Sequence, residues 1–190
     1  MIVRNYETRE AKPKGYPVKR RSRKEIEDAA FLLRRQVGLA TEWCFPIMRY
    51  IECFLPKLRP GFSLEIYGQD DKDARYPGIT ETQSNLIRLR EDVYDLARKG
   101  VGWARGIAAH ELGHLLLGHE VLFAKLSGEP THDFSEDSEW QANVFYGGLL
   151  APPRMTKHLS AEELEQKCGI SHNAAKYAVS RRENRKNGYF

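Results

Sequence analysis

The chain has 190 residues, of which 41% are hydrophobic and 29% charged, a size and balance typical of one globular domain. No apolar run approaches the roughly 18 residues that span a membrane, and the N-terminus lacks a signal-peptide core, so we expect a cytoplasmic protein without a membrane partner. The net charge of +4 is modest, but lysine and arginine are concentrated at both ends, which leaves nucleic acid or an acidic protein as a partner.

Residues 1–21 are polar and basic, and we expect them to form a flexible arm ahead of the folded part. Ser22 and Glu25 have the spacing of a capping box, which predicts that a helix begins here. Gly38 is expected to end that helix.

A second helix is predicted from residue 46 to residue 55, with Pro56 ending it. Residues 62–67 alternate between apolar and polar side chains and predict a strand, and a second strand is expected near residues 85–90. The two strands could pair as an antiparallel unit.

Residues 91–99 are expected to form a short helix or turn, and further helices are predicted over residues 103–117 and 135–150. The last part of the chain, residues 155–190, is expected to form two helices joined by a tight turn and followed by a basic tail. We therefore expect a main domain over residues 22–154, with the C-terminal helical pair packed on it.

The helix expected over residues 103–117 contains the sequence His110-Glu111-Leu112-Gly113-His114. Residues four apart project from one face of a helix, so His110 and His114 could hold one tetrahedral Zn²⁺. Glu111 would lie beside the metal and could take a proton from a water molecule there without being a ligand. The apolar residues around the motif indicate a buried helix, in which both histidines need partners.

A catalytic zinc ion needs a third protein ligand. The H-E-x-x-H-x-x-G-x-x-H pattern is excluded because Leu117 and Glu120 stand where its glycine and third histidine would be. A carboxylate from the next helix is the remaining common option, and helical spacing favours Glu139, which shares a face with Asn143 and Tyr146. Glu136 is the rival ligand or a residue that supports one; the further candidates are Asp137, His132 and Asp133.

Hydrolysis also needs a donor for the oxyanion besides the metal. The candidates are Tyr146, His119, His132 and Arg105, and no pattern singles out one of them. Tyr146 is expected mainly to pack, and Asn143 to steady a ligand. His119 is expected to point away from the two ligand histidines.

These motifs resemble the ImmA/IrrE family of zinc-dependent endopeptidases. The likeness rests on the stretch from His110 to His119, on Glu139-Trp140-Gln141-Ala142-Asn143-Val144-Phe145, and on Leu149-Leu150-Ala151-Pro152. The resemblance implies His110, His114 and Glu139 as zinc ligands and Glu111 as the general base. The chain departs from the family's usual pattern at residues 105–109 and at Tyr146, two places where the difference bears on how the substrate fits.

The resemblance also implies an α+β, gluzincin-like metallopeptidase fold, mostly helical with a small antiparallel or mixed sheet. Members of this family are typically encoded beside a helix-turn-helix repressor, on mobile elements or in stress regulons, and cleave that repressor to relieve repression. The chain is accordingly expected to be a zinc-dependent endopeptidase with such a repressor as its protein partner.

The C-terminal pair supports an alternative of another class. Two short helices joined by a glycine turn, with Arg181 and Arg182 near the end, look like a helix-turn-helix. The chain would then be a regulatory protein that binds DNA or a repressor, with the zinc site structural or inactive. We expect packing or repressor docking here ahead of contact with DNA.

Overall fold

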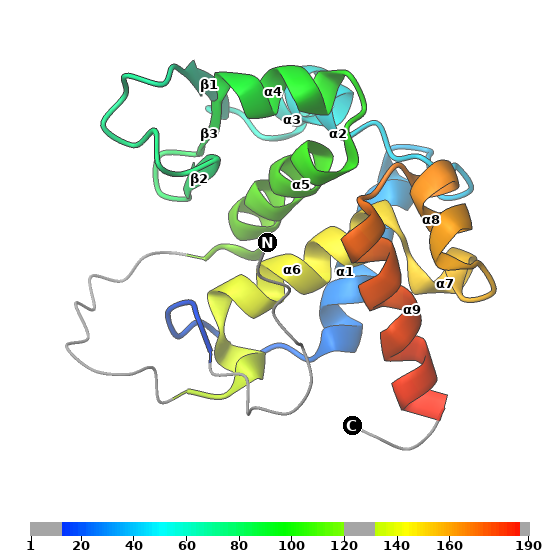
Figure 1. The fold of residues 1–190 in the computed structure, drawn as a ribbon. Coiled ribbons are helices and arrows are strands. Elements are labelled where there is room, and N and C mark those ends of the chain that lie inside the picture. The colour runs from blue at the N-terminus through cyan, green and yellow to red at the C-terminus, as the bar shows by residue number, and fades with distance from the viewer. Residues whose placement is uncertain (1–12, 120–131, 187–190) are drawn as a thin grey trace.

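The computed structural model describes residues 13–119 and 132–186, the last four of these as backbone only. Over this part the protein is α+β, mostly helical with one small mixed sheet (Figure 1). The helices are α1 (Arg23–Gln36), α2 (Ile47–Arg49), the π-helix η1 (Tyr50–Phe54), α3 (Leu55–Leu58), α4 (Glu91–Arg98), α5 (Gly102–Leu117), the 3₁₀ turn η2 (Phe134–Glu136), α6 (Ser138–Leu150), α7 (Pro153–Thr156), α8 (Ala161–Cys168) and α9 (His172–Lys186). The strands are β1 (Ser63–Tyr67), β2 (Gly78–Glu81) and β3 (Leu86–Arg90).

Helix α1 begins and ends as its sequence predicts. The Ser22 side chain accepts a hydrogen bond from the backbone of Glu25, and the Glu25 carboxylate accepts one from the backbone of Ser22, so the capping box is complete. Ile26 and Ala30 on its inner face are fully buried. Gly38, with φ of +73°, follows the last turn in the left-handed region that a side chain would disfavour.

The second predicted helix extends beyond its expected end. Pro56 does not end it: the chain passes from α2 through the π-helix η1 into α3, and Pro56 lies in the first turn of α3. A proline inside a helix removes one hydrogen bond and crowds the preceding turn. Here the preceding turn is already widened, with the Leu55 amide bonded to the Tyr50 carbonyl, and this gives the ring room.

The sheet has the strand order β1-β3-β2, and its pairing differs from the antiparallel unit expected for residues 62–67 and 85–90. Strands β1 and β3 are parallel, whereas β2, which was not predicted, pairs antiparallel with β3. A tight connection from Glu81 to Leu86 places β2 on one edge of β3, which leaves the other edge for β1. Strand β2 is only four residues long and carries one aliphatic side chain, which is why alternation did not reveal it.

Arg88 of β3 fixes the long connection between β1 and β2. Its guanidinium contacts Glu65 on the neighbouring strand, and Asp71 and Asp73 in the polar turn that follows β1, at 2.7–3.0 Å. Because Arg88 is nearly buried, these charge-assisted hydrogen bonds hold the turn against the sheet. The connection then leads the chain to β2, next to α5.

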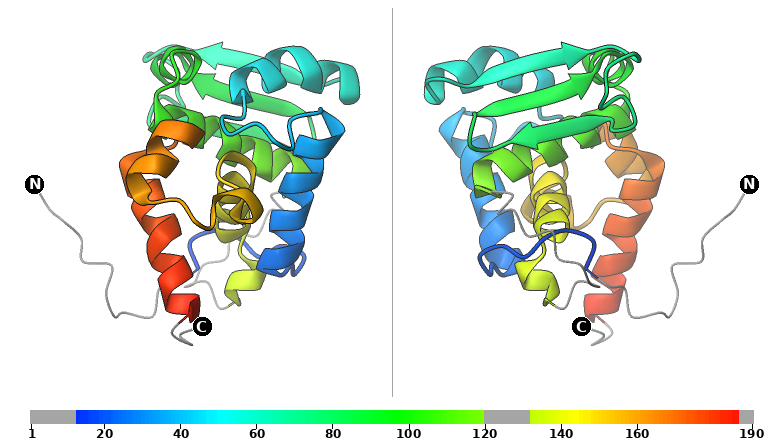
Figure 2. Two further views of the ribbon diagram at one scale, coloured as in Figure 1. Left: turned by 90° about the vertical axis from the view of Figure 1, so that its right-hand side faces the viewer. Right: turned by 90° about the vertical axis from the view of Figure 1, so that its left-hand side faces the viewer.

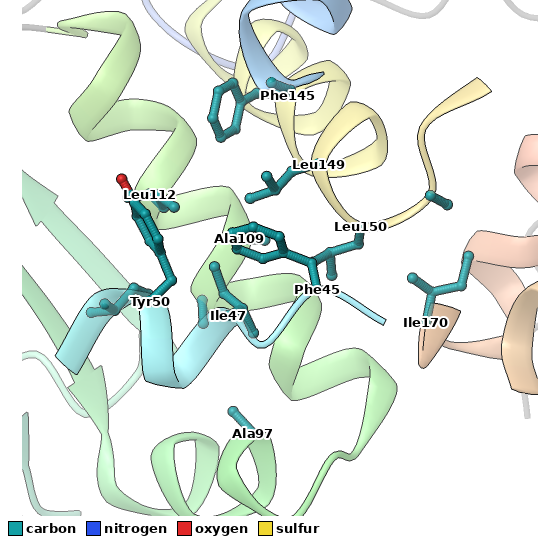
Figure 3. Packing of buried hydrophobic residues seen from close by; sticks show 14 of the residues in the cluster. Phe45, Ile47, Tyr50, Ala97, Ala109, Leu112, Phe145, Leu149, Leu150 and Ile170 are labelled. Atoms are coloured by element: carbon teal, nitrogen blue, oxygen red, sulfur yellow. The ribbon is translucent and has the colours of Figure 1, made fainter. Parts of the chain in front are cut away.

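Most of the apolar core lies between α5, α6, α1 and the α2–η1 segment. Figure 3 shows Tyr50 of η1, Leu112 of α5 and Phe145 of α6 gathered in this core, together with Phe45, which lies just before α2. Figure 2 shows the sheet lying across one end of the helices, with α6 between α1 and α9. Helix α5 contacts both the sheet and α6, so its motif residues lie where the two layers meet.

The helices expected in the C-terminal part are present as α8 and α9. Ser160 and Glu163 form a second capping box, and Gly169, with φ of +61°, lies in the turn between them. Leu164, Cys168 and Ile170 are buried in the same core as α5 and α6. Among the described residues, no helix combines the length and apolar character needed to cross a membrane.

Candidate metal centre

Close packing between α5 and α6 brings the motif histidines opposite α6. The reason is Gly113, whose missing side chain lets the α6 backbone approach: a Cβ there would lie 3.3 Å from Cα of Ala142 and 3.2 Å from the Phe145 ring. Gly106 faces Tyr146 in the same way, at 3.3–3.4 Å. The side of α5 that carries the small residues therefore determines which part of α6 faces the histidines.

The donor atoms of His110, His114 and Glu139 meet at one point. The two histidine Nε2 atoms lie 3.0 Å apart, and the Glu139 carboxylate oxygens lie 3.2 Å from His110 Nε2 and 3.3 Å from His114 Nε2. All of these donor atoms lie within 4.8 Å of one another. Of the carboxylates considered as a third ligand, the structure thus brings Glu139 of α6 to the histidines.

This arrangement fits a tetrahedral metal ion. An ion with bonds of about 2.1 Å holds its donor atoms roughly 3.4 Å apart, close to the separations observed here. Two imidazole nitrogens and a carboxylate are also a common donor set for catalytic zinc, and they leave a fourth position for water or substrate. The Glu139 side chain is 41% exposed, so the site can be reached from solvent.

Glu111 is held beside this cluster by strand β2. The Thr80 hydroxyl lies 2.7 Å from a carboxylate oxygen of Glu111 and 2.9 Å from its backbone carbonyl. Gly78 allows the close approach, because a Cβ at this position would lie 2.8 Å from Cγ of Glu111. Burial raises the pKa of Glu111. Electrostatic interaction with His110 and His114 and the hydrogen bond from Thr80 act in the opposite direction.

Glu139 stands in the first turn of α6, where its position is fixed from two sides. Asp137 caps the helix by accepting a hydrogen bond from the Trp140 amide, and it also accepts one from the Gly15 amide. Gly15 lies directly against Glu139, since a Cβ there would meet the Glu139 amide at 2.7 Å. The imidazoles of His110 and His114, whose Nε2 atoms lie 3.2 and 3.3 Å from the carboxylate oxygens, hold the pKa of Glu139 far below its ordinary value, so it is a carboxylate at neutral pH.

The segment before α1 takes part in the site over the residues that the structure describes. Pro17 pairs with Asp137 as an isolated β-bridge, and the Tyr16 hydroxyl donates to the His119 carbonyl at 2.8 Å. Burial, with the charges of Glu139 and Glu111, raises the pKa of Tyr16 to about 12. The flexible arm expected over residues 1–21 is therefore packed against α6 from Gly15 onward, and residues 1–12 lie outside the described part.

His119 lies next to His114 of the cluster, in contrast to the expectation that it points away. The helix ends at Gly118, which has φ of +66°, and the chain turns so that His119 Nδ1 comes 3.0 Å from His114 Nδ1. The ring is buried, and its burial lowers the pKa of His119 to about 4. Five-residue spacing on a straight helix hides this contact, because the left-handed glycine changes the direction of the chain.

Several other predicted residues lie away from the cluster or are engaged elsewhere. Glu136 is near Arg20, Asp133 pairs with Arg20, and His132 lies 3.1 Å from the capping Asp137. Arg105 is buried away from the cluster, where its guanidinium contacts the Cys44 sulfur and the Phe45 carbonyl, each at 2.8 Å. Glu136 thus lies outside the cluster of His110, His114 and Glu139, and Arg105 does not reach it.

The two remaining candidates on α6 differ in their surroundings. Tyr146 packs against Gly106, and burial raises its pKa to about 12, as expected for a packing residue. Asn143 is exposed one turn after Glu139. Burial acts to lower the pKa of His110, whereas contacts with the Glu139 and Asn143 side chains raise it above its ordinary value. Asn143 is therefore placed where it can steady a ligand.

Comparisons with known proteins show the fold but no family. No protein-family model and no curated protein matches the chain. A solved structure described as "Mycobacterium tuberculosis transcriptional regulator" is similar, with a TM-score of 0.54 and 16% identity. The match covers 83% of this chain but only 46% of that protein, so this chain spans less than half of its length.

Proposed function

We propose that the protein is a gluzincin-like, zinc-dependent endopeptidase of the ImmA/IrrE type that acts on a partner transcriptional repressor. The observation that carries this proposal is the convergence of His110, His114 and Glu139 on one point, with the Glu111 carboxylate buried beside it. A purely structural metal site is usually closed by four protein ligands and has no need for an adjacent buried carboxylate.

The residues divide the chemistry between them. His110, His114 and Glu139 would hold zinc, which when bound supplies Lewis-acid chemistry toward a peptide carbonyl and water. Glu111 would take the proton of the attacking water and pass it to the leaving nitrogen. Thr80 holds the Glu111 carboxylate in place, and burial raises its pKa, which makes it a stronger base.

The proposal is tested by Glu111→Gln, which keeps the shape of the side chain but cannot accept a proton. We expect zinc content equal to that of the unchanged protein and a cleavage rate lower by about 10²–10⁴-fold, the usual contribution of a general base. Zinc is measured by elemental analysis. Cleavage is measured by mass spectrometry on a proteome-derived peptide library and on any helix-turn-helix repressor encoded next to this chain.

Glu136→Gln is the matched control, because Glu136 has the same chemistry but lies outside the cluster near Arg20. It should leave both zinc content and cleavage unchanged. Undiminished cleavage by the Glu111→Gln variant would contradict the mechanism, and absence of zinc from the unchanged protein would contradict the proposal as a whole.

A second candidate function is regulatory binding through α8 and α9. Tyr177 of α9 is 61% exposed, as a contact surface requires. Against DNA as the partner, Arg182 donates to the Leu159 carbonyl and Thr156 hydroxyl, and Arg181 lies 3.7 Å from Glu27. Filter binding to random duplex DNA at several salt concentrations tests DNA as the partner, since contacts with phosphates are strongest at low salt. Absence of binding even at low salt would exclude DNA as the partner.

A further inference from the structure

The buried Gln141 side chain has an orientation that its neighbours determine. Its Nε2 donates to the Lys19 carbonyl at 2.8 Å and to the Ser135 carbonyl at 2.7 Å, while its Oε1 accepts from Arg21 Nη1 at 3.0 Å. Exchanging the two amide atoms would set an oxygen against two carbonyl oxygens and an NH₂ group against a guanidinium. The Gln141 oxygen must therefore be the atom that faces His119, 3.1 Å from its Nε2.

This orientation fixes where the proton of His119 resides. An amide oxygen only accepts hydrogen bonds, so His119 Nε2 has to carry hydrogen. The ring is buried, and neither of its hydrogen-bond partners, Gln141 and His114, carries a negative charge that would favour an imidazolium. A neutral ring with hydrogen on Nε2 has a lone pair on Nδ1, and that atom faces His114.

The same reasoning passes to the metal ligand. His119 Nδ1 lies 3.0 Å from His114 Nδ1, and because the first is an acceptor, the second must be the donor. A neutral His114 with hydrogen on Nδ1 has its lone pair on Nε2. That is the nitrogen that lies 3.0 Å from His110 Nε2 and 3.3 Å from the Glu139 carboxylate.

We propose that His119 and Gln141 are positioning residues that select the tautomer and the ring orientation of His114 required for metal binding. The inference rests on the proposed metal site. Ligand histidines usually direct their second nitrogen to a carboxylate or a backbone carbonyl. Here the acceptor is a second neutral imidazole, and a buried amide decides which of its nitrogens accepts.

The segment before α1 is part of this device. Lys19 supplies a carbonyl that orients the Gln141 amide, and Arg21 supplies a guanidinium that faces its oxygen. Arg21 also donates to the Leu117 carbonyl at 2.9 Å, at the end of α5. Residues 19–21 thus connect the start of the chain to the ligand His114 through three hydrogen-bonded side chains.

The decisive measurement is the tautomer of His119 in the 190-residue chain, read from long-range ¹H–¹⁵N correlation spectra of the imidazole rings. We expect His119 with hydrogen on Nε2 and His114 with hydrogen on Nδ1. His172, whose ring faces Glu165 at the surface, provides a reference signal. A charged His119, or one with hydrogen on Nδ1, would overturn the proposal.

Zinc affinity, measured by competition with a chromogenic chelator, provides the second readout. His119→Phe removes the acceptor and should weaken zinc binding by about 10–100-fold, the usual effect of losing such a partner. His119→Asn places an amide oxygen near the Nδ1 position and should recover part of the loss. Equal affinity of the Phe variant and the unchanged protein would overturn the proposal, as would equal losses for both variants with unchanged circular dichroism.

These results are separable from the fate of the proposed function. Absence of zinc binding or cleavage in the unchanged protein would refute the endopeptidase proposal. The tautomer of His119 would still be read directly, because His119 is not itself a ligand and its ring is detected whether or not a metal is bound.

Discussion

At the scale of single residues, the general base candidate depends on a glycine in another element. Glu111 lies next to His110 along the chain, but its carboxylate is held by Thr80 and covered by Gly78, both of β2. Buried carboxylates need such partners, since an unpaired one is costly to desolvate. The position of Glu111 is therefore sensitive to changes in β2 that do not touch the metal ligands.

Gly78→Ala tests this dependence. The added Cβ would lie 2.8 Å from Cγ of Glu111 and 3.0 Å from Cγ2 of Ile107, so the carboxylate has to move. We expect a loss of cleavage rate of about 100-fold, as for other misplacements of about 1 Å at a catalytic group, with little change in zinc affinity. Gly68→Ala is the control, because its Cβ meets only Asp70, at 3.5 Å. A Gly78→Ala variant as active as the Gly68→Ala variant would refute this dependence.

At the scale of elements, the site is a product of how closely α5 and α6 pack. Two of the proposed ligands come from α5 and the third from the first turn of α6, so the distance between these helices sets the size of the cluster. Gly113 is a point of close approach, with the Ala142 backbone opposite. Small residues at a helix contact shorten the distance between helix axes, which depends on the side chains there.

Gly113→Ala should therefore weaken zinc binding although residue 113 is not a ligand. Its Cβ would lie 3.2–3.3 Å from Phe145 and Ala142, which requires the helices to move apart by a few tenths of an ångström. Chelator competition should show lower zinc affinity and chemical denaturation lower stability. Gly147→Ala in α6 is the matched control: nothing lies within 4 Å of its Cβ, so alanine should stabilise the helix by about 0.5–1 kcal/mol. Unchanged zinc affinity in the Gly113→Ala variant would contradict the argument.

At the scale of the whole molecule, the C-terminal pair shares one core with the site-bearing helices. Leu164 and Cys168 of α8, together with Ile170, are buried in the same cluster as Leu112 and Leu149. Gly102, at the start of α5, lies so close to the Ile170 carbonyl that a Cβ would approach it to 2.7 Å. We therefore expect residues 155–182 to unfold together with α5 and α6.

Leu164→Ala provides the test. Truncating a fully buried leucine costs about 2–5 kcal/mol, and in a shared core this loss should lower the unfolding midpoint of the entire molecule. Circular dichroism and tryptophan fluorescence should report the same, lowered transition. Leu58→Ala is the control, since Leu58 is 62% exposed. Two separate transitions would show that the C-terminal pair is an independent unit.

The sequence by itself determined the features that depend on local chemistry. The capping box at Ser22, the glycine at the end of that helix and the four-residue spacing of His110 and His114 are each properties of a single helix, and each is found where it was predicted. Helical spacing also favoured Glu139 over Glu136, because spacing alone predicts that Glu139 shares a helix face with Asn143 and Tyr146. These predictions depend on a period of 3.6 residues, which short-range interactions impose.

Only the tertiary structure decided which distant segments complete the site. Strand β2 is too short for alternation to reveal, yet it holds Glu111 in place. His119 reaches His114 only because the chain turns at Gly118. Gln141 is oriented by Lys19 and Arg21, which lie 120 or more residues earlier in the chain. Contacts of this kind arise from packing between elements, which no periodicity within a segment encodes. The three residues of the cluster were therefore predictable from one helix and its neighbour, whereas the residues that contact and orient them became visible only once the chain was folded.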